Sequence, residues 1–293
     1  MMEASLRLNR NWQRALVAIA VVTVLAVMLA VPPVRAAARD LLGIFRMERL
    51  VVLPVTTGQI QNLENVERQL GYEFFPGSFE TLAEPGEPQY VDSAAAAADA
   101  AGYAVRTPAA LPPADEVIVR GEMAMRIVPD VALMQEIFRA ANLDPALVPE
   151  SIDGQQFDLT MHSSVVQLWN STDEAIMVMQ MPGPTASFPD AVNEAELANA
   201  MLQLLGYAPE EAAALSTSID WMTTLVLPLP VDEVDYQDVT VGGEQGVLLT
   251  GRSPSSDSEM PYGAVVWQQD GIVYVVAGQP DSARLLEIAN SLQ

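Results

Sequence analysis

One stretch of the sequence has the residue types of a hydrolase, because the only histidine, His162, is followed directly by Ser163 and Ser164. A serine hydrolase needs a histidine base that is held by a carboxylate and lies next to an exposed hydroxyl. The Gly-x-Ser-x-Gly elbow does not occur in the sequence, and the nearest stretch, residues 251–253, runs into Pro254. We therefore expect no enzyme and interpret His162 as a polar residue at a strand end, with an exported hydrolase that uses His162 as the alternative.

Two residue types are missing from the sequence, and each absence excludes a class of chemistry. No lysine occurs, which excludes a Schiff base and a Walker A phosphate loop. No cysteine occurs, which excludes disulfides, thiolate metal ligands and a cysteine nucleophile. The acids Asp232, Glu233, Asp235 and Asp238 lie close together, but they lack the order and the central glycine of a calcium loop. We interpret them as a solvated face, and we expect neither a metal ion nor a cofactor.

Methionines repeat at strand spacing in two places. Met177, Met179 and Met181 alternate along one segment, so their side chains share one face of a strand, and Met123 and Met125 repeat the pattern earlier. Methionine packs adaptably and suits surfaces that accept variable apolar partners. These five residues are the candidate ligand groove, for a lipid, a lipopeptide or an apolar peptide. Two other interpretations stay open: an ordinary core beneath helices, and copper bound by thioethers, although no second ligand type lies near.

The segment that decides where this chemistry takes place is Ala15 to Val31, a run of seventeen residues without a charge. A helix of that length spans about 25 Å. Val34 brings the run close to the ~30 Å hydrocarbon thickness of a bilayer. We therefore expect a single-pass transmembrane helix over residues 15–34, after a short cytoplasmic head at residues 1–14.

The arginines around this run set the expected orientation. Arg7, Arg10 and Arg14 precede it against a single acid, which is typical of a head kept in the cytoplasm. Four arginines also follow the run closely and, taken alone, favour the opposite orientation. A cleaved signal peptide is a further alternative, because residues 34–36 resemble a cleavage site. We expect a protein of the cell membrane, with the bulk of the chain outside the cytoplasm.

The amino-acid composition limits which partners the part of the chain after the membrane run can bind. The chain has 293 residues and a net charge of -24, and the 244 residues after Arg49 hold seven arginines and 35 acids. Such a body is repelled by nucleic acid and by anionic lipid surfaces. Half of all residues are hydrophobic, which is not the composition of an acidic disordered tail. We therefore expect a folded domain without a nucleic-acid partner.

Local patterns predict an α+β protein with a mostly antiparallel sheet and helices packed on one face. Residues 35–91 are expected to hold a juxtamembrane helix, a strand at 46–55 and a linker at 76–89, before an extracytoplasmic domain at 92–293. Apolar spacing and end signals predict helices over residues 60–70, 94–101, 131–141, 193–205, from 209 onward, and 281–292. Further strands are predicted over residues 157–161, 165–169 and 175–181.

Glycine-containing turns predict three hairpins. Asp270-Gly271 is a type I′ signal between two apolar runs, residues 264–268 and 272–277. Gly242-Gly243 separates residues 239–241 from residues 247–250. A third hairpin is expected where residues 120–122 separate residues 117–119 from residues 123–128.

Three parts of the sequence carry a family resemblance. The first is the tail from Val266-Trp267 through Asp270-Gly271 and Tyr274 to Gly278 and the final stretch 285–292. The second is residues 37–52, which read Ala-Arg-Asp-Leu-Leu-Gly-Ile-Phe-Arg in their middle, and the third runs from Ala101-Gly102-Tyr103 through Arg106-Thr107-Pro108 to Leu111-Pro112. Together they resemble an uncharacterised bacterial domain that is found outside the membrane, at the C-terminus of single-pass anti-sigma-factor-like proteins.

The resemblance implies an α+β sensor-like ectodomain, similar to periplasmic sigma regulators and to the half-barrel of lipoprotein carriers, and no enzyme activity. One departure matters, because the fourteen residues before the membrane run cannot hold a helical sigma-binding domain and contain no zinc motif. We therefore expect that this chain does not sequester a sigma factor by itself. The expected function is a membrane-anchored sensing or interaction module, in envelope or anti-sigma regulation, that binds a protein partner or an apolar ligand.

Overall fold

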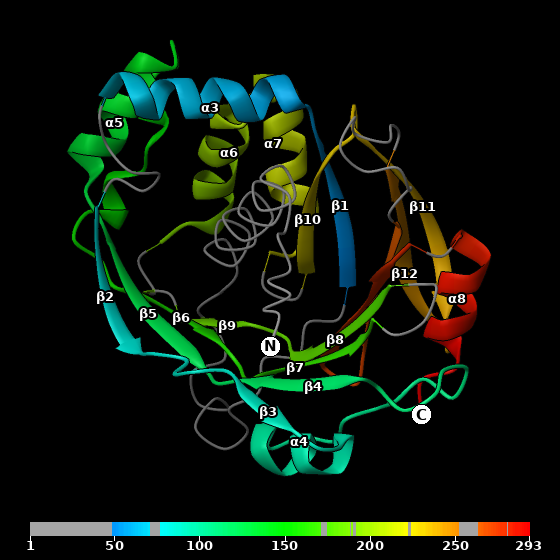
Figure 1. The fold of residues 1–293 in the computed structure, drawn as a ribbon. Helices are drawn as coiled ribbons and strands as arrows, with labels where there is room; N and C mark the ends of the chain where they lie inside the picture. Colours follow the sequence, from blue (N-terminus) through cyan, green and yellow to red (C-terminus); the bar gives the residue numbers. More distant parts are fainter. Residues whose placement is uncertain are drawn as a thin grey trace.

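The computed structural model describes residues 49–70, 77–170, 175–187, 189, 192–221, 224–251, 263–279 and 281–293 (Figure 1). The expected cytoplasmic head, the transmembrane helix around Ala15 to Val31 and the juxtamembrane helix lie outside these residues. Within the described ranges, no helix has the length and hydropathy needed to cross a membrane. The described part confirms an α+β fold with mostly antiparallel sheets.

Strands and helices alternate along the described chain. The strands are β1 (Arg49–Val55), β2 (Gly77–Ala83), β3 (Gln89–Val91), β4 (Glu116–Arg120), β5 (Met123–Pro129), β6 (Phe157–Met161), β7 (Ser164–Trp169), β8 (Ile176–Pro182), β9 (Thr185–Ser187), β10 (Thr224–Pro230), β11 (Val234–Val241), β12 (Glu244–Gly251), β13 (Gly263–Gln269) and β14 (Ile272–Gly278). The helices are α3 (Thr57–Leu70), α4 (Ala94–Ala101), α5 (Val131–Ala140), α6 (Glu194–Leu204), α7 (Pro209–Ser218) and α8 (Ser282–Asn290), with short 3-10 helices η2 (Pro145–Leu147) and η3 (Glu150–Ile152) after α5.

Three long strands bend and join two sheets into one curved layer (Figure 1). One sheet has eight strands in the order β11-β12-β13-β14-β8-β7-β4-β3, and the other has four in the order β2-β5-β6-β9. Arg120 pairs with Ser164 in the first sheet and Met123 pairs with Met161 in the second, which is one continuous register. The ladders of β8 and β9 on β7 and β6 share one register in the same way. The bends lie at residues 121–122, 162–163 and 183–184.

The first bend corrects a prediction. The hairpin expected across residues 120–122 is wrong, because β4 and β5 are consecutive parts of one long strand and pair with β7 and β6 instead of with each other. The bend also brings Gly121 against the loop before β3, since a Cβ on Gly121 would lie 2.4 Å from the carbonyl oxygen of Pro85. Residues 120–122 have a turn-forming pattern, but here they only bend the strand, because β4 pairs with β7 and β5 pairs with β6.

Helices α4 and α8 cover one face of the eight-stranded sheet, which we call the outer face. From α8, Leu285 and Ile288 pack in a buried cluster with Trp267 of β13. From α4, Ala97 packs in a second cluster with Val117 of β4. Because side chains alternate along a strand, the residues between these contacts face the other way.

The opposite face, the inner face, carries the parallel pair β1 and β10. Leu225 and Leu227 of β10 pack against Val266 and Val273 of this face. A larger cluster of β1, α5, α6 and α7 forms on Ile127 of β5. Helix α3 crosses the open end of the curved layer (Figure 1). Helices therefore lie on both sides of the layer, whereas the sequence predicted helices on one face.

Several local predictions are confirmed by backbone geometry. Helix α4 begins at Ser93, whose hydroxyl accepts a hydrogen bond from the amide of Ala96, and ends at Gly102 in the left-handed conformation. The turn between β13 and β14 has φ of 54° at Asp270 and 81° at Gly271, as a type I′ turn requires. The linker expected over residues 76–89 is wrong in part, because residues 77–83 form β2, which pairs with β5.

Candidate functional site

The three alternating methionines of β8 lie on the inner face. Met177 is flanked by Leu168 of β7 and Ala277 of β14, and Met179 lies between two valines in the same way. Met177, Met179 and Met181 are all half-buried. Val178, between them, is fully buried on the outer side. The inner face of the strand is therefore a strip of adaptable thioether side chains.

The two groups of predicted methionines partly converge in space. Met125 of β5 and Met181 of β8 pack against one buried cluster, although they are far apart in the sequence. The cluster consists of Leu159, Leu225, Leu227, Val266 and Val273. Met123 lies opposite Met161 at the start of β5. Met125 and Met181 thus belong to a core, and Met177 and Met179 continue the apolar strip along β8.

A cavity of about 410 Å³ lies between β1 and the strands β11 and β12. It is lined by Leu50, Val51, Val52, Tyr236, Asp238, Val239, Thr240, Gln245, Gly246 and Val247. None of the predicted methionines is among these lining residues, and strands β13 and β14 separate the cavity from β8. The cavity is open to solvent on one side, where Tyr236, Asp238 and Thr240 are exposed, and its volume falls within the roughly 300 to 1,000 Å³ of small-molecule sites.

The walls of this cavity differ in polarity. The β1 wall is aliphatic, with Leu50, Val51 and Val52, whereas the wall from β11 and β12 mixes valines with polar side chains. Among the described lining residues Asp238 is the one carboxylate, and it is exposed. The cavity therefore suits an apolar group with a neutral or cationic end, and it disfavours an anion. Sequence reasoning missed it because β1 meets β11 and β12 only in the folded chain.

His162 lies at the second bend, between an acid and a hydroxyl. Its Nδ1 is 3.1 Å from Oε2 of Glu122, and its Nε2 is 3.4 Å from Oγ1 of Thr185. The three residues come from three neighbouring strands at their bends, and the His162 side chain is 30% exposed. Its position directly after β6 confirms the predicted strand end. The hydroxyl at its ring belongs to Thr185, whereas the sequence pointed to the adjacent serines.

Two residues of the acidic cluster, Asp232 and Glu233, lie just before β11 and accept hydrogen bonds from the start of helix α3. Both carboxylate oxygens of Asp232 accept from the amide of Thr57 at 2.9 Å, and Glu233 accepts from the Thr57 hydroxyl at 3.1 Å. Thr57 begins α3, where a carboxylate satisfies amides that lack a partner within the helix. Among the described residues, no three histidine or acidic side chains lie close enough to hold a metal ion.

Two of the three parts that carry the family resemblance, the tail and residues 101–112, meet on the outer face, whereas the described residues of the third part, 49–52, lie in β1. We call residues 103–115, which lead from α4 to β4, the strap. Gln167 and Gln180, both buried, donate to the carbonyl oxygen of Arg106 in the strap at 2.8 and 2.6 Å. The Arg106 guanidinium lies 5.4 Å from the centre of the Tyr274 ring, which stacks on Trp267. Trp267 is buried, and these residues hold the strap against the sheet.

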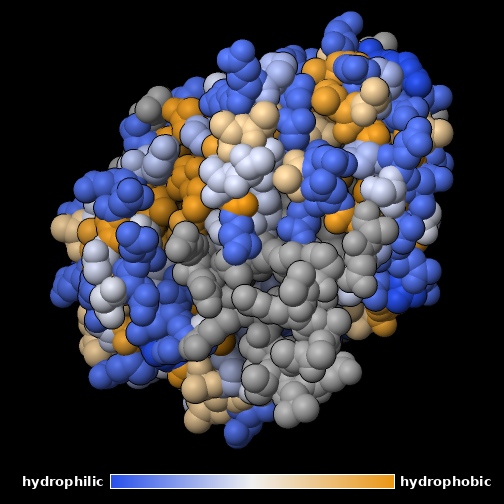
Figure 2. All heavy atoms as spheres, turned by 180° about the vertical axis from the view of Figure 1, so that it is seen from behind, coloured by the Kyte–Doolittle hydropathy of each residue, from blue (hydrophilic) through white to orange (hydrophobic). Residues whose placement is uncertain are grey.

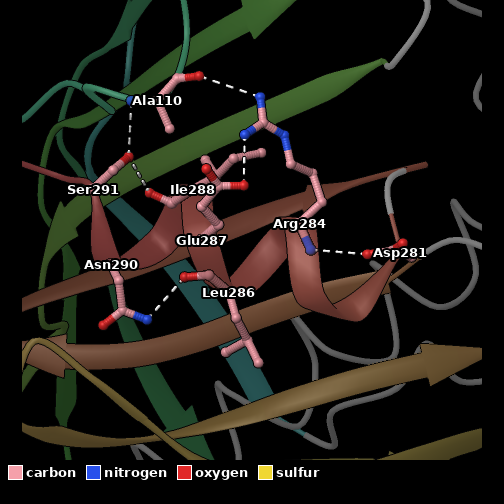
Figure 3. A network of polar contacts seen from close by, with 8 residues as sticks. All are labelled: Ala110, Asp281, Arg284, Leu286, Glu287, Ile288, Asn290 and Ser291. Atoms are coloured by element: carbon pink, nitrogen blue, oxygen red, sulfur yellow. Dashed lines mark hydrogen bonds and ion pairs between the residues drawn. The ribbon is translucent and has the colours of Figure 1, made fainter.

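The C-terminal helix α8 makes hydrogen bonds with the same strap (Figure 3). Arg284 donates to the carbonyl oxygen of Ala110 in the strap at 3.2 Å and to Glu287 at 2.8 Å. The amide of Ala110 donates to the Ser291 hydroxyl at 3.2 Å. Backbone hydrogen bonds between Thr107 and the last residue complete the attachment. The strap and the C-terminus therefore hold each other on the sheet.

Seen from behind, the described surface of the molecule is mostly hydrophilic, with hydrophobic areas between the hydrophilic ones (Figure 2). No protein-family model, no curated protein and no solved structure matches this chain. The family resemblance therefore stays a prediction from the residues that carry it.

Proposed function

We propose that this chain is a membrane-tethered extracytoplasmic binding module whose inner sheet face takes an apolar ligand. The observation that carries the proposal is the cavity of about 410 Å³ between the aliphatic β1 and the strands β11 and β12. The uncharged run Ala15 to Val31 supports the tether, and the resemblance supports a setting in envelope or anti-sigma regulation. A family resemblance alone does not establish function, so the experiment below tests the cavity.

The lining residues specify the class of ligand. Leu50, Val51 and Val52 offer an aliphatic wall to a hydrocarbon chain, and the polar side chains of β11 meet its end group. The exposed carboxylate of Asp238 favours a cationic or neutral end group. The half-buried methionines of β8 offer further adaptable apolar surface on the same face. The proposed ligand is an amphipathic lipid-like molecule without a net negative charge.

Photo-crosslinking of the full-length chain tests this proposal. The probe is a long-chain alkylamine that carries a diazirine and an alkyne, and mass spectrometry of digested protein locates the crosslink. We expect labelled peptides from β1, β11 and β12. Thr240→Trp fills the cavity from an exposed lining position, so we expect labelling there to fall about tenfold, or ~1.4 kcal/mol of binding.

The matched control is Gln237→Trp. Gln237 is exposed on the same strand, alternation places it on the opposite face to Thr240, and it is not among the cavity lining residues. Labelling in Gln237→Trp should equal that of the wild type. Labelling confined to residues 15–34, or unchanged by Thr240→Trp, would contradict a ligand in the cavity.

A second candidate function is hydrolysis at the second bend, where His162 lies between the carboxylate of Glu122 and the hydroxyl of Thr185. In this role the Thr185 hydroxyl attacks the carbonyl carbon of an ester, His162 takes the hydroxyl proton and gives it to the departing alcohol, and water then cleaves the acyl-threonine, while Glu122 orients the imidazole. Ester hydrolysis measured with p-nitrophenyl acetate should then fall by a factor on the order of 10² or more in His162→Gln. Thr185→Ser should retain activity while Thr185→Ala loses it. Equal rates in the wild type and in His162→Gln eliminate this candidate.

A further inference from the structure

The polar and the apolar residues of the inner cavity lie at different depths. Tyr236, Asp238, Thr240 and Gln245 line the cavity and are exposed, so they form its mouth. Val247 also lines it but is only 4% exposed, and the lining residues of β1 are half-buried. A long amphipathic molecule therefore fits with its apolar tail inside and its polar end group at the mouth.

Three side chains of the mouth lie close together on one face of the sheet. Asp238 and Thr240 are two positions apart on β11, which places them on the same face about 7 Å from each other. Gln245 of β12 pairs directly with Thr240, and the side chains of such a pair begin about 5 Å apart. One small end group can therefore contact all three side chains.

These three side chains hold no other part of the described structure in place. Within the described ranges, the structure shows no hydrogen bond or ion pair of the Asp238, Thr240 or Gln245 side chains. The nearby acids Asp232 and Glu233 differ, because they accept hydrogen bonds from the start of helix α3. Strands β11 and β12 also contain no basic residue that would neutralise Asp238.

The acceptors at the mouth match a primary ammonium group. Such a group has three N–H donors and no acceptor. The Asp238 carboxylate, the Thr240 hydroxyl and the side-chain carbonyl of Gln245 each supply an acceptor, and the bond to the carboxylate is charge-assisted. A quaternary ammonium has no N–H donor and is bound by several aromatic rings, whereas Tyr236 is the one aromatic residue among the described lining residues.

We propose that the mouth of the cavity binds a primary ammonium group, so that the ligand is an amphipathic molecule with this end group. The inference rests on the proposed function, because it specifies the end group of the same ligand. It narrows that ligand from any neutral or cationic amphiphile to one chemical class. Asp238 is the residue that selects this class, with Thr240 and Gln245 as the further acceptors.

Photo-crosslinking of the full-length chain with two probes tests this inference. Both probes carry the same alkyl chain, diazirine and alkyne, but one ends in a primary amine and the other in an alcohol. We expect the amine probe to reach half-maximal labelling of β11 and β12 at a concentration at least about tenfold lower than the alcohol probe. Dodecyltrimethylammonium should compete with the amine probe at least about tenfold more weakly than dodecylamine does.

Asp238→Asn tests the carboxylate, because it removes the charge and keeps the size of the side chain. We expect the half-maximal concentration of the amine probe to rise about tenfold and that of the alcohol probe to stay within about twofold. Thr240→Val removes one acceptor at similar size and should also weaken the amine probe selectively. The matched control is Glu136→Gln, which makes the same charge change at an exposed position of α5 outside the cavity and should leave both probes unchanged.

The outcomes separate this inference from the proposed function. Equal labelling by the two probes, or an amine preference that persists in Asp238→Asn, would overturn the ammonium site and leave the apolar cavity in place. Equal weakening by Asp238→Asn and Glu136→Gln would show only general attraction to an acidic protein and would overturn the ammonium site as well. If neither probe labels β1, β11 or β12, the proposed function fails, and this inference fails with it.

Discussion

At the scale of single residues, three tyrosine hydroxyls are removed from water. Burial is the largest cause that raises the pKa of Tyr103, Tyr207 and Tyr274 above the ordinary value. Tyr103 donates to the carbonyl oxygen of Gln180 at 2.6 Å, and Tyr207 donates to that of Pro54. These phenols hold their protons in the folded state at a pH where the unfolded chain loses them.

This difference predicts a loss of stability in alkali. An unfolded tyrosine titrates near pH 10, so above that pH the unfolded chain binds fewer protons than the native chain. The free energy of unfolding therefore falls as pH rises from about 10 toward the higher native pKa values. We expect the urea midpoint to begin to drop near pH 10 and to keep falling as the pH rises further. Tyr207→Phe should make this drop shallower, because it removes one titrating phenol.

The control for the alkaline transition is Tyr90→Phe. Tyr90 is 71% exposed, so its removal should leave the steepness of the pH dependence unchanged. A Tyr207→Phe protein that loses stability with pH as steeply as the wild type and Tyr90→Phe would show that the buried phenols do not cause the transition.

Residue roles were predictable from sequence where the signal is local. His162 was expected at a strand end, and it lies there, but its partners Glu122 and Thr185 are 40 and 23 residues away. Gln167 and Gln180 are buried because both bind the Arg106 carbonyl, 61 and 74 residues distant. Nothing near either glutamine in the sequence indicates burial, because the compensating group comes from another element.

At the scale of elements, the bend between β4 and β5 depends on a close backbone contact. A Cβ at residue 121 would lie 2.4 Å from the carbonyl oxygen of Pro85 and would push the loop before β3 away. We expect Gly121→Ala to lower the free energy of unfolding by about 1 to 3 kcal/mol, as other overpacked sites do. Urea denaturation of the two proteins measures the difference.

Gly58→Ala is the matched substitution for this measurement. The atom nearest to a Cβ on Gly58 is 3.8 Å away, and the residue lies in α3, where alanine favours the helix by about 0.5 to 1 kcal/mol. The stability of Gly58→Ala should equal or slightly exceed that of the wild type. If Gly121→Ala is equally stable, the contact with Pro85 does not constrain the bend.

Elements with local signals were predictable, and elements formed by long-range pairing were not. Helix α4 and the turn at Asp270-Gly271 follow from their own caps and turn residues. Strand β10 contains Pro228 and Pro230, which argue against a strand, yet it pairs in parallel with β1. The methionines of β8 were expected to share a face, and they do, whereas the cavity between β1 and β11 could not be read from either strand.

At the scale of the whole molecule, the two faces and the β2 edge of the curved layer differ in what covers them. Its outer face is closed by α4, α8 and the strap, whose hydrogen bonds join them to the C-terminus. Its inner face holds the cavity beside β1, the first described strand after the proposed tether. Its β2 edge offers exposed apolar and acidic side chains.

Native mass spectrometry of the full-length chain, released gently from its own membrane, tests the central claim most directly. We expect the wild type and Gln237→Trp to carry a lipid-like adduct without a net negative charge, identified after denaturing extraction. Thr240→Trp, which fills the cavity beside Leu50 and Val247, should carry less of it. A wild type without any adduct, or one whose adduct is equally retained in Thr240→Trp, would contradict an apolar ligand in the inner cavity.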